Sequence, residues 1–109
     1  MAIDSHRLAE ERSIAYHRAI AARIARQPAL LERARERVRA WLEESPPPRY
    51  ALGWAEVLRR DRDSIRVFLT DPGERARELR QSSPFAGALS AAERWEIWRR
   101  IRREEVTLA

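Results

Sequence analysis

Apolar residues recur at intervals of three and four along most of the chain, a spacing that places them on one face of an α-helix. The interval is clearest in residues 28–44, where one side of the expected helix is apolar and the other is charged. No segment shows the strict alternation that is typical of a half-buried strand. The pattern predicts an all-α fold, a compact bundle of about five to six helices.

Residues with strong conformational preferences divide the chain into helices. Proline disfavours helix at the residue before it, so Gln27 and Ser45, each followed by proline, mark two breaks. The prolines at 46–48 form a stiff spacer, and we interpret residues 45–49 as a hinge. The predicted helices cover residues 4–26, 28–44, 49–59, 62–70, 72–81 and 91–105, with a loose tail at 106–109.

Short polar side chains predict how the later helices begin. Asp61 or Asp63 can cap the fourth helix, because a side-chain oxygen accepts hydrogen bonds from the free N–H groups of a first turn. Asp71 and Ser90 are each followed three residues later by a glutamate. This is the capping-box pattern, and it predicts the starts of the fifth and the last helix.

Large aromatic side chains are expected to fill the core, because they lie on the apolar sides of the predicted helices. We expect Trp41, Trp54, Phe68 and Trp95 to pack there with aliphatic partners. A chain of 109 residues can bury one modest core but not two. Residues 1–109 are therefore predicted to form a single helical domain.

The chain is arginine-rich, and all 22 of its basic residues are arginine. The net charge of +5 is compatible with nucleic acid or an acidic protein as a partner. However, 17 acidic residues are interspersed with the arginines, and pairs such as Glu32–Arg35 are helical neighbours. We interpret the charged face of residues 28–44 as solvated, with a nucleic-acid-binding face as the alternative.

The sequence shows no feature of a secreted or membrane protein. The longest stretch without charge has twelve residues, too few to span a bilayer, and the start of the chain lacks a signal-peptide pattern. There is no cysteine, which excludes disulfides and thiolate sites. We expect a cytoplasmic protein that does not bind membranes.

No arrangement of residues predicts catalysis. His6 and His17 are eleven residues apart without companion ligands at metal spacing, and His17 falls on an apolar face, where we expect it to be packed. Ser82 and Ser83 lack a nearby histidine that would activate them. No glycine-rich loop is present to cradle a phosphate. We predict that the protein is not an enzyme and has no metal or cofactor.

Residues 81–92 carry no charge in a chain of which 36% is charged, and two interpretations stay open. Phe85 and Leu89 can close the base of the core at a helix junction. Alternatively, Phe85 anchors a recognition surface flanked by arginines, since interface hot spots are often aromatic or arginine residues. The predicted partner-binding residues are Arg77, Arg80, Phe85 and Arg94, whereas Pro84, Gly87, Leu89 and Ser90 are expected to be architectural.

A DNA-binding function is the alternative to protein binding. Residues 72–81 and 91–105 could form a helix-turn-helix, although their connection is longer than usual and contains proline. Arginines on the last helix could also contact phosphates without sequence preference. The nucleic-acid-binding residues predicted on this alternative are Arg99, Arg100, Arg102 and Arg103.

Two parts of the chain resemble small, uncharacterised bacterial proteins. They are RQSSPFAGALS at residues 80–90 followed by ERW at 93–95, and HRAIA at 17–21 followed by PALLERAR at 28–35 and WL at 41–42. Those proteins are similar to antitoxin components of toxin–antitoxin modules. The resemblance implies a helical protein whose partner is a toxin enzyme, with a nucleotidyltransferase-like toxin as the first expectation.

These observations lead to one functional hypothesis and one alternative. The hypothesis is a protein-binding module, an antitoxin that binds and inhibits a toxin enzyme, with arginines meeting acidic groups there. The alternative is a DNA-binding regulator or autorepressor that acts through arginine–phosphate contacts. A homo-oligomer is also open, because the stripes at residues 14–24 and around Trp41 could pair between chains.

Overall fold

The structure is a computed structural model that describes residues 5–108, and the side chains of residues 5–104. Over that part of the chain there are six α-helices and no strand, so the prediction of an all-α bundle is confirmed. The helices are α1 (Ser5–Ile24), α2 (Ala29–Leu42), α3 (Arg49–Val57), α4 (Arg62–Leu69), α5 (Glu74–Arg80) and α6 (Ala91–Leu108).

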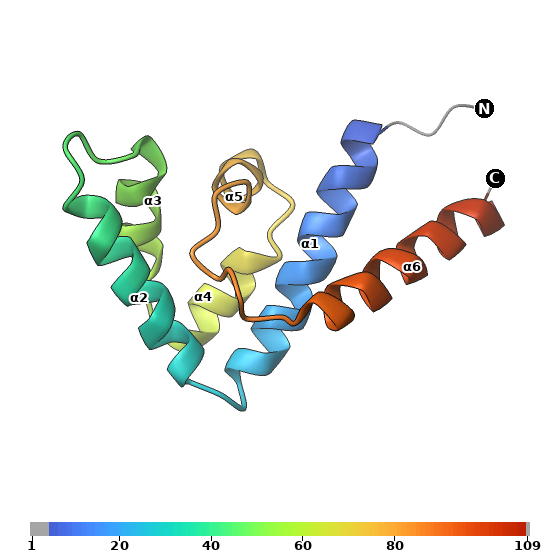
Figure 1. The fold of residues 1–109 in the computed structure, drawn as a ribbon, viewed down its shortest axis with the longest axis horizontal. Helices are drawn as coiled ribbons and strands as arrows, with labels where there is room; N and C mark the ends of the chain where they lie inside the picture. The colour runs from blue at the N-terminus through green and yellow to red at the C-terminus, as the bar shows by residue number, and fades with distance from the viewer. Residues whose placement is uncertain (1–4, 109) are drawn as a thin grey trace.

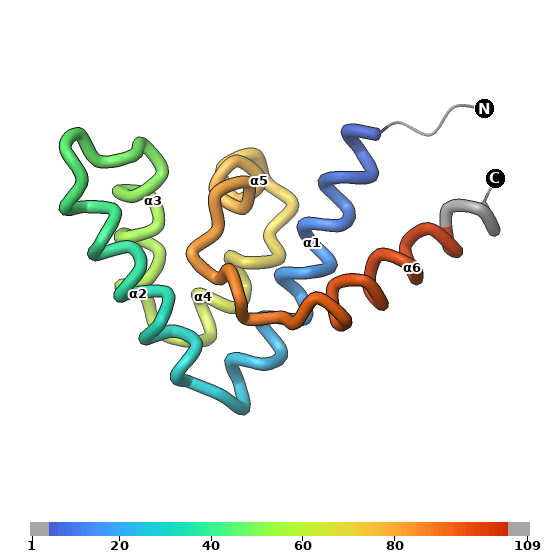
Figure 2. The backbone as a smooth tube through the Cα atoms, viewed as in Figure 1, coloured from blue at the N-terminus to red at the C-terminus, as the bar shows by residue number. Residues whose placement is uncertain are grey.

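The first helix organises the bundle. It packs against α4, α5 and α6, whereas α2 packs against α3. Figure 1 shows α1 and α2 joined at one end and diverging, with the three short helices between them and α6 on the outer side of α1. Figure 2 shows the loop between α5 and α6 crossing the space between α2 and α1. None of the described helices is both long enough and apolar enough to span a bilayer.

Trp54 lies at the centre of the core with no exposed surface. Its indole Nε1 donates a hydrogen bond of 2.9 Å to the carbonyl of Leu79, which satisfies the polar edge of the ring. The rings of Phe68 and Phe85 meet Trp54 edge-on, with centroids 5.9 and 6.1 Å away. The predicted core positions of Trp54 and Phe68 are confirmed.

The other two predicted core tryptophans lie further out. Trp41 is half-buried at the margin, where it meets Tyr50 edge-on at 4.8 Å between centroids. Trp95 is 58% exposed, so its predicted place in the core is wrong. The reason is the orientation of α6, which turns Ile97 and Ile101 inward. Trp95 is two residues before Ile97 and is therefore about 200° away around the helix.

The helix ends follow the predictions in most places. Asp61 caps α4 by accepting a 2.9 Å hydrogen bond from the N–H of Ser64. The predicted capping box at Asp71 is wrong, because its Oδ1 instead accepts from the N–H of Gly73 at 2.6 Å and α5 begins at Glu74. Helix α6 continues to Leu108 rather than ending near 105, and Ala109 lies outside the described residues.

Candidate functional site

The uncharged loop between α5 and α6 is a structural junction. Phe85 is only 4% exposed and packs on Trp54, so in this conformation it is not a surface anchor. Pro84 and Leu89 are also buried. Gly87 has a φ of 85°, a left-handed conformation that residues with a Cβ rarely adopt. The four residues expected to be architectural therefore include three with a clear structural role here.

The predicted flanking arginines are engaged within the chain. Arg80 is 4% exposed, and its Nη1 donates to the carbonyls of Leu69 and Asp71 at 3.2 and 2.7 Å. Arg77 donates to Glu10 on α1 at 3.1 Å. Burial lowers the pKa of the Arg80 guanidinium more than any neighbouring charge does. The structure thus uses these two arginines to fix α5 in the bundle.

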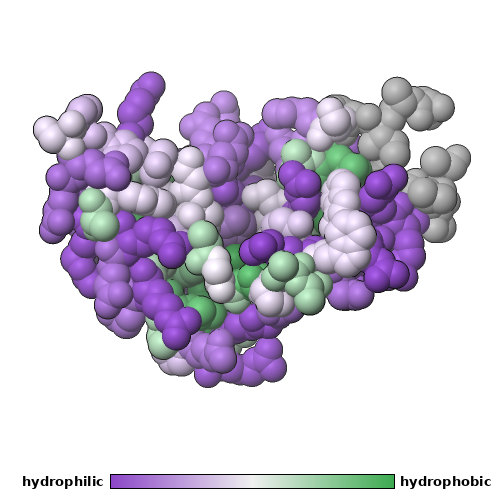
Figure 3. All heavy atoms as spheres, in the orientation of Figure 1, coloured by the Kyte–Doolittle hydropathy of each residue, from purple (hydrophilic) through white to green (hydrophobic). Residues whose placement is uncertain are grey.

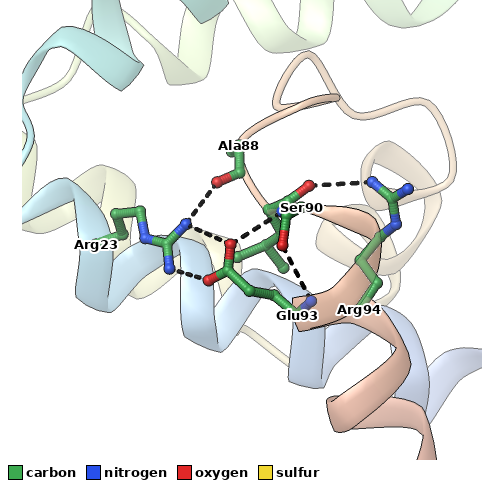
Figure 4. A network of polar contacts seen from close by, with 6 residues as sticks. Arg23, Ala88, Ser90, Glu93 and Arg94 are labelled. Atoms are coloured by element: carbon green, nitrogen blue, oxygen red, sulfur yellow. Dashed lines mark hydrogen bonds and ion pairs between the residues drawn. The ribbon is translucent and has the colours of Figure 1, made fainter.

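Arg94 belongs to a network that attaches the start of α6 to α1 (Figure 4). Ser90 and Glu93 form the predicted capping box, in which each side chain accepts from the other's N–H at 3.1 and 3.0 Å. Arg23 of α1 pairs with both carboxylate oxygens of Glu93 and donates to the carbonyl of Ala88 at 2.9 Å. Arg94 donates to the Leu89 carbonyl at 3.1 Å.

The Glu93 carboxylate is held in its charged form by these contacts. The hydrogen bonds from Arg23, followed by that from the Ser90 N–H, lower the pKa of Glu93 from 4.5 to about 2. A carboxylate with a lowered folded-state pKa contributes stability above its unfolded pKa and loses it as the pH falls through the folded value. The contact between α1 and α6 is therefore maintained at every pH above about 4.5.

His17 and Ser83 form a long-range pair that the sequence did not reveal. The histidine is 5% exposed, and its Nε2 lies 2.9 Å from the Ser83 hydroxyl. Its Nδ1 lies 2.8 Å from the carbonyl of Ser13, an acceptor only, so Nδ1 carries the proton. Nε2 therefore accepts from Ser83. The statement that Ser83 has no nearby histidine holds in sequence but is wrong in space.

This pair has the polarity of a base and a hydroxyl nucleophile, yet its contacts are those of a tie between α1 and the loop. The Ser83 hydroxyl also accepts from the N–H of Phe85 at 3.2 Å, which fixes the loop. The backbone carbonyl of Ser13 orients the imidazole. His17 is packed, as its apolar position predicts. Among the described residues, no group of three or more acidic, histidine or cysteine side chains could hold a metal ion.

The buried imidazole predicts acid sensitivity. Burial lowers the pKa of His17, so below about pH 6.5 the unfolded chain binds more protons there than the folded one. The free energy of unfolding should fall below that pH by up to about 1.4 kcal/mol per unit until the folded value is reached. We expect urea unfolding between pH 5.5 and 7.5 to show this slope.

A His17→Gln variant provides the control, because glutamine can hydrogen-bond but does not titrate. We expect its free energy of unfolding to be nearly constant from pH 7.5 to 5.5. A slope equal to that of the unsubstituted chain would show that another group causes the acid sensitivity.

A groove between α2 and α3 is the open surface with the clearest chemistry. It has a volume of about 440 Å³ and a floor of four aliphatic residues, Val38, Leu42, Ala55 and Leu58. Its remaining lining residues are all arginine: Arg35, Arg39 and Arg59. None of the residues that line this groove is acidic.

The three arginines differ in how firmly they are held. Arg35 pairs with Glu32 at 2.6 Å, as predicted, and its Nε donates to the carbonyl of Leu58 at 3.1 Å. This bond ties α2 to the end of α3. Arg39 and Arg59 are exposed and have no hydrogen bond or ion pair in the described part of the chain. Their guanidinium groups are therefore available to a ligand.

The sequence did not single out this groove. Arg35 and Arg39 are four residues apart, parallel to Val38 and Leu42, which places an arginine row beside an aliphatic row on α2. That pairing of rows was the available signal. Arg59 could not be added without knowing that α3 packs on α2, because it comes from another helix.

The arginines predicted for nucleic-acid binding lie exposed on α6 but not as a uniform basic surface. Arg99 pairs with Glu96 at 3.4 Å, and Arg102 lies over the ring of Trp98 at 5.9 Å. Arg100 lines a groove with α1, and Arg103 also has contacts within the chain. Over its whole length α6 has five arginines and four glutamates, which leaves one net positive charge. Moreover, α6 packs on α1 rather than on α5, unlike the predicted helix-turn-helix.

No known protein family, curated protein or solved structure matches the chain. The resemblance to antitoxins consequently stays a prediction. We therefore base the functional proposal on the surfaces of the molecule, and chiefly on the groove between α2 and α3.

Proposed function

We propose that the protein is a binding module that holds an acidic, partly aliphatic segment of a partner protein in the groove between α2 and α3. The observation that supports this is the arginine rim over an aliphatic floor, without an acidic lining residue. Arginine forms planar, two-point contacts with carboxylates and is well suited to protein interfaces. The floor would receive an aliphatic side chain of the same segment.

The floor of the groove favours a peptide over single-stranded nucleic acid. Proteins that bind single strands combine basic residues with aromatic rings on which the bases stack. Here the four floor residues are aliphatic, and the lining contains no aromatic side chain. Phosphate contacts alone would give a salt-dependent attraction without a place for the base.

The resemblance to antitoxins supplies the identity of the partner in this proposal. A toxin enzyme, first of all a nucleotidyltransferase-like one, would be bound in the cytoplasm and inhibited. Enzymes that act on nucleotides usually hold Mg²⁺ with carboxylates. Arg39 and Arg59 would meet such acidic groups, or acidic residues beside them, and the bound module would obstruct the active site.

Charge reversal in the groove tests the proposal. We expect Arg39→Glu/Arg59→Glu to weaken binding to the product of the adjacent gene at least about tenfold, or about 1.4 kcal/mol. Both guanidinium groups would be replaced by carboxylates that repel an acidic segment. Co-expression and pull-down would identify the complex, and titration calorimetry would measure its dissociation constant.

The matched control is Arg26→Glu/Arg49→Glu, which changes the net charge equally at exposed arginines outside this groove. It should bind as the unsubstituted chain does. Equal losses in both variants would indicate a general charge effect, and no complex with any neighbouring gene product would overturn the proposal. Binding to promoter DNA that weakens steeply with salt would favour the DNA-binding alternative.

A further inference from the structure

The groove between α1 and α6 is a second open surface, remote from the proposed partner site. Helix α6 is attached to the bundle by few side chains, since Ile101 is the one buried residue between 91 and 104. The groove is lined by six apolar side chains, Ile14, Ala15, Ala19, Ala22, Ile97 and Ile101. Most of them are small, so the backbone of another helix could approach closely.

The two helices run antiparallel, which fixes where the charges of this groove lie. Arg12 of α1 lies over the ring of Trp98, and Arg23 further along α1 pairs with Glu93. Glu104 is therefore at the end of the groove that holds the beginning of α1, beside Glu11. Arg18 lies seven residues after Glu11, about 10 Å further along the axis. The groove has an acidic end and a basic end.

The charged residues at these two ends are open to a partner. Neither Arg18 nor Glu104 has a hydrogen bond or ion pair in the described part of the chain. Both are exposed. Glu11 has only a loose pair with Arg7 at 3.9 Å, and Arg100 lies between the ends, one helical turn from Glu104. The ends of the groove therefore carry opposite charges that do not meet each other.

We propose that this face binds a second copy of the chain in a two-fold symmetric dimer. A two-fold axis brings the same patch of both copies together, so the patch must be complementary to itself. Rotation about an axis through the middle of the groove places Arg18 of each copy against Glu104 of the other. The alanine and isoleucine side chains between these pairs would be buried.

A second copy fits this face better than a partner of uniform charge. An acidic partner would be repelled at the Glu11 and Glu104 end, and a basic partner or a phosphate backbone would be repelled at the Arg18 end. The face of two adjacent helices is about 27 Å long and about 20 Å wide. This is large enough for a small homodimer interface of about 800 Å² per copy.

A charge swap tests this arrangement in the full chain. Sedimentation equilibrium should give twice the monomer mass of 12.8 kDa for the unsubstituted protein. Arg18→Glu or Glu104→Arg alone should raise the dimer dissociation constant at least about tenfold. The double variant Arg18→Glu/Glu104→Arg should recover most of the loss, because each new pair forms again between copies.

The recovery distinguishes this proposal from a structural role. Arg18 and Glu104 lie at opposite ends of one groove, so a swap within one chain cannot restore a contact. Circular dichroism would verify that every variant keeps its helix content, and Arg26→Glu should leave the dissociation constant unchanged. A monomer at all concentrations up to about 100 μM would overturn the proposal, as would a dimer whose single and double variants are equally weakened.

Discussion

Replacing Phe85 with alanine is expected to lower the free energy of unfolding by about 3–5 kcal/mol. The ring is 4% exposed and lies edge-on to Trp54, and the loop that carries it is fixed on both sides. Removing it would leave a cavity that the constrained loop cannot close. Urea unfolding followed by circular dichroism would measure the loss.

Arg94→Ala is the comparison, because Arg94 follows the same loop but is exposed and donates only to the Leu89 carbonyl. We expect it to cost about 1 kcal/mol or less. The pair also separates the two interpretations of the loop. A Phe85→Ala protein that kept its stability but no longer bound its partner would make Phe85 a recognition residue.

Replacing Trp54 with alanine is expected to have a loss as large, about 3–5 kcal/mol. Trp54 has no exposed surface and contacts both Phe68 and Phe85. Small domains are stable by only about 5–15 kcal/mol, so this variant should be near its unfolding midpoint at moderate urea concentrations. Thermal unfolding followed by circular dichroism would detect the lower melting temperature.

Trp54→Phe separates the hydrogen bond from the volume of the ring. Phenylalanine keeps most of the aromatic surface but leaves the Leu79 carbonyl without the indole N–H. An unpaired buried carbonyl costs about 1–3 kcal/mol, which is the loss expected here. If Trp54→Phe were as stable as the unsubstituted chain, the indole hydrogen bond would contribute no net stability.

Local signals predicted most of the fold. The period of the apolar residues and the prolines after Gln27 and Ser45 placed the helices, because both act through the backbone over a few residues. The caps at Asp61 and Ser90 also follow from their neighbours. Asp71 was assigned wrongly, since the same pattern allows its side chain to bond the N–H two residues later instead of three.

The candidate sites depend on contacts between distant parts of the chain, and these are where the sequence was insufficient. His17 and Ser83 meet across 66 residues, and no local pattern links them. Arg59 joins the groove arginines only because α3 packs on α2. Trp95 looked like a core residue because its type is apolar, but the face that α6 turns inward is decided by α1. Arg80 was expected to be exposed because arginine usually is.

The capping box at Ser90 has a consequence for cooperativity. One carboxylate, that of Glu93, both completes the first turn of α6 and binds Arg23 of α1. A first helical turn is costly to nucleate on its own, because several residues are ordered for a single backbone hydrogen bond. Here the group that favours nucleation is ordered by the helix against which α6 docks. The last helix is thus expected to form and to attach in a single step, as part of one folding unit with α1.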